Sequence, residues 1–280
     1  MHSLAAFLRL PLKSGRSFLG VCRQRRQLIV LLAYREVTDR FAGSVIGAAW
    51  ALFHPLAIML VYAMIFGFLF RMRFPEGAGP AGADFAAYFI AGYLPWMTIQ
   101  DILGRSCSTI TQSHNLVKQV VFPLEVLPLR SVLAACLPQA VGTLFLLAYS
   151  LLKAGTLPLS LVLLPCVWLV EFAVLVGIAF FLSSVSVYMR DLKEFVTVCL
   201  AVGLYTLPII FMPGSLPPTF EAILWLNPFS HLVWMHQDVA FYGAIVHPWS
   251  WPIAALFAVA SFSLGYSTFG RLKQGFGNCL

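Results

Sequence analysis

The 280-residue chain is too hydrophobic to be a soluble domain: 60% of its residues are hydrophobic, 10% are charged, and its mean hydropathy is +0.86. A soluble protein of this size would lack the polar surface that it needs, so the composition excludes the soluble classes and indicates an integral membrane protein. Membrane topology and contact with anionic lipid explain the net charge of +7, which therefore does not indicate nucleic-acid binding.

Two segments precede the first long apolar run. Residues 1–26 are basic and lack the apolar stretch and cleavage site of a signal peptide, so we predict a basic cytosolic tail. In residues 27–44 apolar and charged side chains recur on opposite sides of a helix, which predicts an amphipathic helix along the cytosolic membrane surface. The apolar positions are Val30, Tyr34, Val37 and Phe41, and the charged ones are Arg35, Glu36, Asp39 and Arg40. Glu36 and Arg40 stand in the acid-first i, i+4 order that favours an ion pair within one helix.

Gly43 and Gly47 lie four residues apart where this helix meets the membrane. Such a pair permits close contact between two helices, and it equally permits a simple bend of the chain. The sequence leaves both interpretations open.

Six apolar runs follow, at 45–70, 85–103, 131–152, 157–183, 195–212 and 251–269. The first contains no Asp, Glu, Lys or Arg, and at about 1.5 Å per residue it is long enough to cross a hydrocarbon layer of about 30 Å. We therefore predict an all-α integral membrane fold with six transmembrane helices, in a domain that spans residues 45–280.

The basic residues set the orientation of these spans. With six spans and both termini on one side, all but three of the 18 Lys and Arg residues lie on that side; the exceptions are Arg71, Arg73 and Lys153. The positive-inside rule then places both termini in the cytosol.

The loop between the fifth and sixth spans is unusually apolar. It has no Lys or Arg, and Asn227 and Pro228 divide it into two apolar pieces that are each too short to cross a bilayer. We predict a re-entrant pair of short helices over 213–247, buried against protein. The alternative is an aromatic belt at the outer membrane surface.

Two acidic residues fall inside predicted spans. Glu171 lies near mid-membrane without another ionisable residue in its span, so we predict a structural hydrogen bond within the bundle; proton coupling is the alternative. Asp101 is predicted at the membrane surface. The cysteines, and His231 with His236, show no metal-ligand spacing, so no catalytic or metal site is predicted. The sequence also lacks a G-x-x-x-x-G-K-[ST] phosphate loop, so any use of ATP requires a separate chain.

Five stretches carry a family resemblance in chain order. They are Arg35-Glu-Val-Thr-Asp-Arg-Phe-Ala-Gly-Ser44 with Gly47, Trp50 and Pro55; Ala91-Gly-Tyr-Leu-Pro-Trp96; Asn115-Leu-Val-Lys118 with Phe122-Pro123; Tyr188-Met-Arg-Asp191; and Leu226-Asn-Pro-Phe229. Together they resemble the ABC-2 type permeases of polysaccharide exporters, the membrane subunits of O-antigen, capsule and teichoic acid exporters. The resemblance covers nearly the whole chain beyond residue 25. Ala42 and Ile46 depart from the family pattern, which often has a basic residue and Leu there.

The resemblance implies a homodimer of six-span protomers in the bacterial cytoplasmic (inner) membrane. Two copies of a separate ATPase subunit would hold ATP and Mg²⁺, and this chain would need no cofactor of its own. The interface helix would use Arg35, Asp39, Arg40, Ser44 and Gly47. The ATPase would contact a coupling segment with Asn115, Leu116, Val117, Lys118, Phe122 and Pro123, and also Arg190 and Asp191; an ordinary loop is the alternative. The re-entrant pair would form an external gate with Trp225, Asn227, Pro228, Phe229, Trp234 and Tyr242.

A polysaccharide needs a path whose walls contact sugar rings without holding any one of them. Aromatic faces suit that role, because they stack weakly on the apolar C–H faces of sugars. We predict that the first and fifth spans line the path with Trp50, Phe53, Tyr62, Phe66, Phe70, Tyr205 and Phe211. For each of these residues the alternative is contact with lipid or with other parts of the protein.

The predicted function is ATP-driven export of a lipid-linked polysaccharide, of the O-antigen or capsule type, through a channel at a homodimer interface. One alternative is ABC-2 export of a small lipid, drug or haem. Another is proton-coupled secondary transport, which would need no ATPase and would depend on Glu171. A membrane enzyme is disfavoured, because the sequence shows no cluster of acids or histidines. The polymer and its lipid anchor are left open.

Overall fold

The computed structural model describes residues 2–70, 84–114, 122–155, 157–211 and 216–279, which are helical for most of their length. The longer helices are α1 (His2–Asp39), α2 (Trp50–Ala63), α3 (Phe85–Thr109), α5 (Val126–Ala154), α6 (Leu164–Val185), α7 (Leu192–Gly203) and α10 (Ser250–Leu272). The shorter ones are α8 (Pro218–Leu226), α9 (Pro228–Gln237) and α11 (Phe276–Cys279). Single turns of 3-10 helix lie at Gly47–Ala49, Thr111–Ser113, Leu159–Leu163, Leu204–Thr206 and Lys273–Gly275, and π-helical turns at Met64–Leu69 and Asp238–Tyr242. The all-α prediction is confirmed for the described residues.

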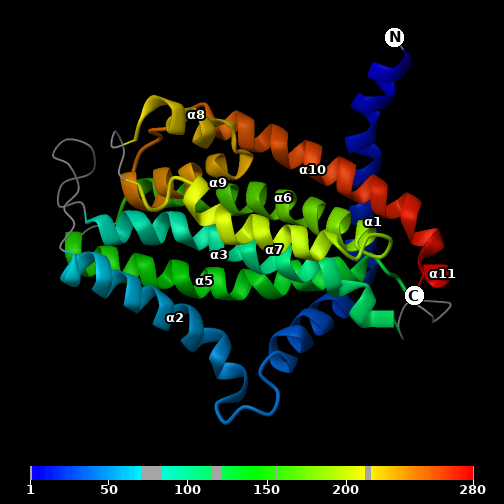
Figure 1. Cartoon of the computed structure of the whole chain (residues 1–280), viewed down its shortest axis with the longest axis horizontal. Coiled ribbons are helices and arrows are strands. Elements are labelled where there is room, and N and C mark those ends of the chain that lie inside the picture. The colour runs from blue at the N-terminus through cyan, green and yellow to red at the C-terminus, as the bar shows by residue number, and fades with distance from the viewer. Residues whose placement is uncertain (1, 71–83, 115–121, 156, 212–215, 280) are drawn as a thin grey trace.

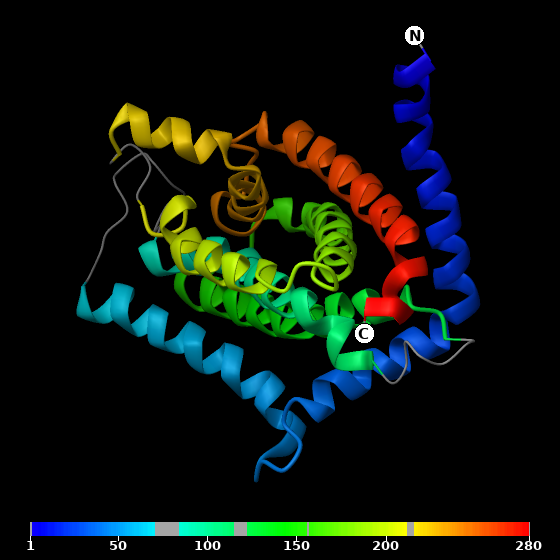
Figure 2. The same ribbon diagram turned by 45° about the vertical axis from the view of Figure 1, so that its right-hand side comes forward.

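The helices form one bundle (Figure 1). Most side chains of α3 are buried, and this helix packs against α5, α6 and α9. α2 packs along α5, α7 packs along α3, and α6 packs against α10. The N-terminal end of α1 projects from the bundle in both Figure 1 and Figure 2. α3 is therefore the central element on which the outer helices assemble.

α6 and α10 approach so closely that only glycine fits where they cross. A Cβ atom added at Gly177 or at Gly265 would overlap the backbone of the other helix. Lipid tails are as apolar as Leu, so helices in a membrane associate through close packing of this kind. The crossing therefore holds α10 against the rest of the bundle.

Within the described residues, four helical stretches are long and apolar enough to cross a membrane: Gly47–Leu69, Val126–Lys153, Leu159–Val185 and Ser250–Gly275. They coincide with the predicted first, third, fourth and sixth spans. The predicted second span lies on α3, which has 25 residues but is not among the four. The predicted fifth span does not form one long helix: α7 has 12 residues and ends in a 3-10 turn shortly before Pro208, whose ring disfavours helix in the preceding residue. The six-span threading stays a prediction.

Residues 2–26, in the segment predicted as a basic cytosolic tail, belong to α1. The backbone of this helix breaks once, at Arg25, where φ is −112° and ψ is 16°. Phe18 packs on α10, with its ring centroid 5.0 Å from that of Phe262, and the hydroxyl oxygens of Ser17 and Tyr266 are 3.2 Å apart. Part of this segment therefore belongs to the bundle.

α1 ends at Asp39, before the predicted residue 44, and the chain then bends. Gly43 and Gly47 adopt positive φ values of 81° and 59°, which favour glycine, and a Cβ at either position would have nothing within 4 Å. The two glycines therefore serve the bend, and no described part of this chain packs closely on them. Ser44 closes the bend: its hydroxyl donates to the Phe41 carbonyl at 2.8 Å and accepts from the Gly47 N–H at 3.1 Å.

α8 and α9 are two short helices that meet at Asn227 and Pro228, where the sequence predicts a break. The Asn227 side chain accepts a hydrogen bond from the Phe229 N–H at 3.1 Å and so caps α9, and Pro228 occupies its first turn. Every residue from Ser230 to Gln237 is buried, whereas α8 is largely exposed. Protein therefore surrounds α9, as the re-entrant model requires; entry of the pair into the membrane stays a prediction.

Candidate functional site

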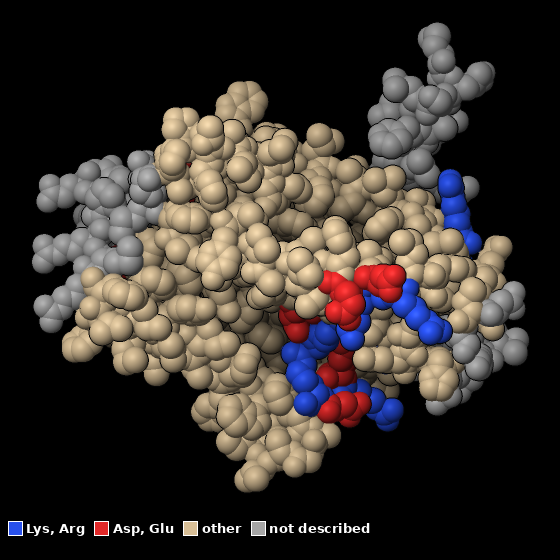
Figure 3. Space-filling view, viewed as in Figure 1, with Lys and Arg blue, Asp and Glu red and all other residues tan. Residues whose placement is uncertain are grey.

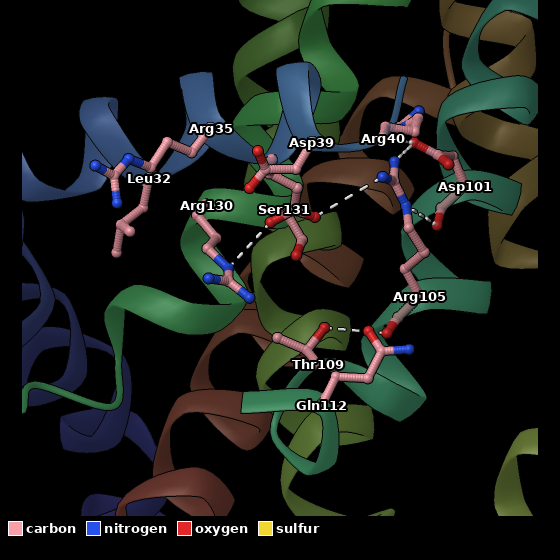
Figure 4. Close-up of a pocket in the computed structure, with 11 residues that line it drawn as sticks. Leu32, Arg35, Asp39, Arg40, Asp101, Arg105, Thr109, Gln112, Arg130 and Ser131 are labelled. Atoms are coloured by element: carbon pink, nitrogen blue, oxygen red, sulfur yellow. Dashed lines mark hydrogen bonds and ion pairs between the residues drawn. The ribbon is translucent and has the colours of Figure 1, made fainter. Parts of the chain in front are cut away.

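Charged side chains gather toward one end of the face shown in Figure 3. Glu36 of α1 forms an ion pair with Arg130 of α5, with 3.1 Å between Oε2 and Nε, and another with Arg105 of α3 at 3.8 Å. Arg40 pairs with Asp101 of α3 at 3.5 Å, and Asp101 also pairs with Arg105. In Figure 4, Arg40, Asp101 and Arg105 turn toward one another. These five residues, the interface network, tie the end of α1 to α3 and α5.

The interface network corrects the predicted ion pair between Glu36 and Arg40. α1 packs against α5 and ends at Asp39, so Glu36 forms ion pairs with cations of α3 and α5, while Arg40, just beyond the helix, pairs with Asp101. The helix also has a third side that the amphipathic pattern does not reveal: Ile29 is buried against the bundle, while Val30 and Tyr34 are exposed. Burial lowers the pKa of Arg40, which stays a cation at neutral pH because a guanidinium titrates far above pH 7.

A pocket of about 590 Å³ opens beside the interface network. Arg35 and Asp39, both predicted site residues, lie on its wall, and Figure 4 shows Arg35 apart from the ion pairs. Both side chains are exposed, and neither makes an ion pair within the described part of the chain. Both cations and acids line the pocket, so its wall presents both signs of charge.

Most of the predicted coupling segment cannot be placed. Asn115, Leu116, Val117 and Lys118 lie outside the described residues, and their contact with an ATPase stays a prediction. Phe122 is partly buried against the core, and the Pro123 carbonyl accepts the N–H of Val126 at 3.1 Å, at the start of α5. The segment therefore leads directly into one of the long helices.

Arg190 and Asp191 are exposed in the turn between α6 and α7. The Tyr188 hydroxyl in this turn donates to a backbone carbonyl at the end of α10 at 3.0 Å. At the same end of α10, Lys273 Nζ donates to Glu125 Oε1 at 2.6 Å, just before α5 begins. The C-terminal end of α10 therefore contacts the turn that carries Arg190 and Asp191, and it contacts the chain just after the predicted coupling segment.

The predicted lining residues fall into two groups. Four of them are exposed: Trp50 and Phe53 on α2, Phe70 just after the π-helical turn that follows α2, and Tyr205 in the 3-10 turn that follows α7. The other three are partly buried among aromatic neighbours: the Tyr62 and Phe66 rings lie 4.5 and 4.7 Å from Phe89 of α3, and Phe211 lies 5.7 Å from Phe220 of α8. The exposed group has surface available to a sugar chain, lipid or a second subunit. A lining role for all seven stays a prediction.

The predicted gate residues hold α8 and α9 together. The Trp225 ring lies 4.8 Å from that of Trp234, which is buried and stacks on His247 at 5.2 Å. Asn227 Nδ2 donates to the Thr206 carbonyl at 3.1 Å and so connects the pair to the end of the α7 segment. Phe229 packs on Phe257 of α10 at 5.6 Å, and Tyr242 lies 6.3 Å from Tyr88 of α3. These residues form one cluster at the end of the bundle opposite to the interface network.

A buried polar network joins α5, α6 and α9, and the sequence does not reveal it. Gln139 Nε2 donates to Glu171 Oε2 at 2.5 Å, and the same oxygen lies 3.2 Å from His236 Nε2. The predicted structural hydrogen bond of Glu171 is therefore confirmed. Glu171 has no other ionisable residue in its own span, and packing of α9 into the bundle brings His236 to it from a distant part of the chain. Among the described residues, no three His, Cys, Asp or Glu side chains come together as metal ligands.

Known proteins match almost the full length of this chain. The model of the family "ABC-2 type transporter" matches residues 27–241. The O-antigen export system permease protein RfbA of Myxococcus xanthus is 28% identical over 240 residues, 85% of this chain and 88% of the relative. The protein of the same name in Klebsiella pneumoniae is 23% identical over 256 residues, 90% of this chain and 95% of the relative. The polysialic acid transport protein KpsM of Escherichia coli is 22% identical over 244 residues, 87% of this chain and 92% of the relative.

Proposed function

This chain belongs to the ABC-2 type transporter family, and from that premise we propose that it is the membrane permease subunit of an ATP-driven exporter of a lipid-linked polysaccharide. The observation that carries the proposal is the similarity to O-antigen and polysialic acid transport proteins over 85–90% of the chain. The sequence has no phosphate loop of its own. A separate ATPase therefore supplies the energy, as two copies bound to a homodimer of this chain.

The end of the bundle that carries the interface network faces the cytosol in this proposal. The network lies where α1 and α3 end and α5 begins, and Arg190 and Asp191 lie in the turn that joins α6 to α7. Basic residues of bacterial membrane proteins concentrate on the cytosolic side, which supports this orientation in the inner membrane with both termini inside. The ATPase would dock on this end.

The exposed aromatic residues of α2 and the α7 segment form the path in this proposal. Phe53 and Tyr205 are 55% and 59% exposed in the isolated chain. Of the 18-residue stretch that represents Gly47–Leu69, only 11% is buried inside the chain, against 28–44% of the corresponding stretches in the other three candidate spans. The first span thus has a large apolar surface left for a second subunit, for lipid or for a sugar chain, which supports a channel between two protomers.

The cluster of α8 and α9 closes the opposite end of the path. Its aromatic side chains pack on α3 and α10, so the gate rests directly on the helices of the bundle. A closed gate stops leakage of small solutes when no polymer is being moved. In this proposal, polymer leaves the path when α8 and α9 separate from their neighbours.

Copurification with an ATPase tests this assignment. The tagged chain, solubilised from its own cells, is expected to carry a nucleotide-binding protein in a 1:1 ratio, and deletion of its gene is expected to leave finished polymer inside the cell. Replacement of Arg190 and Asp191 by Ala is expected to reduce the bound ATPase. Lys153→Ala is the matched control, because this exposed charge lies at the opposite end of the bundle.

Two results would contradict the assignment. One is purification of a stable, active chain with no nucleotide-binding protein attached. The other is polymer export that continues without the ATPase and stops in Glu171→Gln, which is the behaviour of a proton-coupled transporter.

A further inference from the structure

Three buried polar side chains connect the short helix α9 to α5 and α6. Gln139, Glu171 and His236 have only 4%, 2% and 2% of their surface exposed. Glu171 Oε2 accepts from Gln139 Nε2 at 2.5 Å and lies 3.2 Å from His236 Nε2, and the two nitrogens are 3.4 Å apart. One carboxylate oxygen is thus shared by two helices that are far apart in the sequence.

The imidazole of His236 lies at hydrogen-bond distance from the Glu171 carboxylate. His236 Nδ1 lies 2.9 Å from the Leu232 carbonyl, which can only accept, so Nδ1 carries a hydrogen and donates it. His236 Nε2 then faces a carboxylate oxygen at hydrogen-bond distance, and two lone pairs would repel each other there. Gln139 Nε2 relieves this repulsion, because its two N–H groups can donate to Glu171 Oε2 and to His236 Nε2, which lie 2.5 and 3.4 Å away. A further proton on either His236 or Glu171 would join Nε2 and Oε2 directly.

Glu171 depends on this contact more than an exposed acid would. Its second oxygen, Oε1, is buried and has no hydrogen-bond partner among the described residues. A carboxylate in the middle of a membrane helix is costly unless it is paired. A movement of α9 away from α6 would remove His236 and leave Glu171 with the Gln139 bond alone.

The other polar contacts of α9 lead to different parts of the molecule. His231 contacts Ser250 of α10 at 3.1 Å and the Trp225 carbonyl of α8 at 3.1 Å. Gln237 donates to the Pro208 carbonyl, in the segment after α7, at 2.8 Å. Only the network of Gln139, Glu171 and His236 links α9 to the long helices α5 and α6 through a potentially charged contact in the described part of the chain.

We propose that Gln139, Glu171 and His236 are positioning residues that hold the gate helix α9 against α5 and α6, and that the gate opens only when the contact between His236 and Glu171 breaks. This inference rests on the proposed gate function of α9. The apolar contacts of α9 resist its movement weakly, because lipid or protein can replace them, whereas the polar contacts among Gln139, Glu171 and His236 are made only in the packed arrangement. The network therefore biases the gate toward the closed arrangement.

Thiol labelling of α9 measures how often it opens. Val233 is fully buried on α9 and is not part of the network. In the permease–ATPase complex, with the six native cysteines replaced by Ala, Val233→Cys introduces a single thiol. Its rate of labelling by a membrane-impermeant maleimide, added outside intact cells without substrate, is proportional to the open population. Gln139→Leu and His236→Leu are expected to raise this rate at least about tenfold, because each removes one of the two polar partners of the buried Glu171 side chain.

Two further variants keep the test independent of folding defects. Glu171→Gln keeps the size of the side chain and its hydrogen-bonding capacity but loses the charge, so we expect a labelling rate between those of the wild type and His236→Leu. Ser230→Ala is the matched control: Ser230 is a buried polar residue of the same helix whose hydroxyl has no partner among the described residues, and we expect no change. Hydrogen exchange at the amides of 230–237 in Glu171→Gln gives a second reading, expected to be faster than in the wild type.

Wild-type labelling rates in His236→Leu and Glu171→Gln would overturn the inference, and so would a rise in Ser230→Ala as large as that in His236→Leu. Polymer export is measured separately in the same cells. Normal export with unaltered labelling rates contradicts the role proposed for Gln139, Glu171 and His236 and leaves the exporter assignment intact. If the variants raise the labelling rate but polymer export does not require this chain, the role proposed for the three residues is supported and the exporter assignment is contradicted.

Discussion

The ion pair between Glu36 and Arg130 is expected to hold the interface helix against α5, and its strength can be worked out from the structure. At 3.1 Å and an effective dielectric constant of about 20, the direct attraction is about 5 kcal/mol. The two side chains are 16% and 21% exposed, so desolvation and screening reduce the net contribution to about 1–2 kcal/mol. Removal of either partner should therefore lower the melting temperature by roughly 2–8 °C.

Thermal unfolding of detergent-solubilised Glu36→Gln, Arg130→Gln and the double variant measures this contribution. The double variant should lose less stability than the two single variants added together, because both remove the same pair. Arg35→Gln is the matched control: its side chain is exposed and apart from the interface network, so its melting temperature should not change measurably. Strictly additive losses in the double variant would refute the pairing, and so would an equal loss in Arg35→Gln.

Three further predictions concern the helix crossing, the bend and the path. Gly265→Ala should cost about 1–3 kcal/mol of stability, because the new methyl group overlaps the backbone of α6. Gly270→Ala on the same helix should leave stability unchanged, because its Cβ meets nothing within 4 Å. Equal melting temperatures of the two variants would contradict this prediction. Ser44→Ala removes both hydrogen bonds that close the bend and should cost about 1 kcal/mol of stability. The expected result is faster proteolysis between α1 and α2, and an unchanged cleavage rate would show that the Ser44 hydroxyl does not stabilise the bend. Tyr205→Ala should leave the amount of protein unchanged, since this residue is exposed, but slow polymer export; normal export would remove Tyr205 from the lining of the path.

The features that the sequence predicts correctly are those that a single segment decides. The apolar run at 251–269 coincides with α10, because a helix in lipid must satisfy its own backbone and must be long enough to cross the hydrocarbon layer. The break at Asn227 and Pro228 is equally local, because Pro lacks an N–H and the Asn side chain caps the helix that follows. At Gly43 and Gly47 the sequence allows both a bend and a close helix contact, and the positive φ values of the structure decide for the bend.

The partners of the polar side chains were decided only by the tertiary structure. Glu36 has Arg40 four residues further along the chain, yet it forms ion pairs with Arg105 and Arg130, because α1 ends at Asp39 and lies against the bundle with the Glu36 side inward. Glu171 has no partner in its span and acquires His236 from a short helix 65 positions further along the chain. Hydropathy reports how much of a helix prefers lipid or protein, but it does not encode the rotation and depth at which two helices pack, and these set which polar atoms come within hydrogen-bond distance.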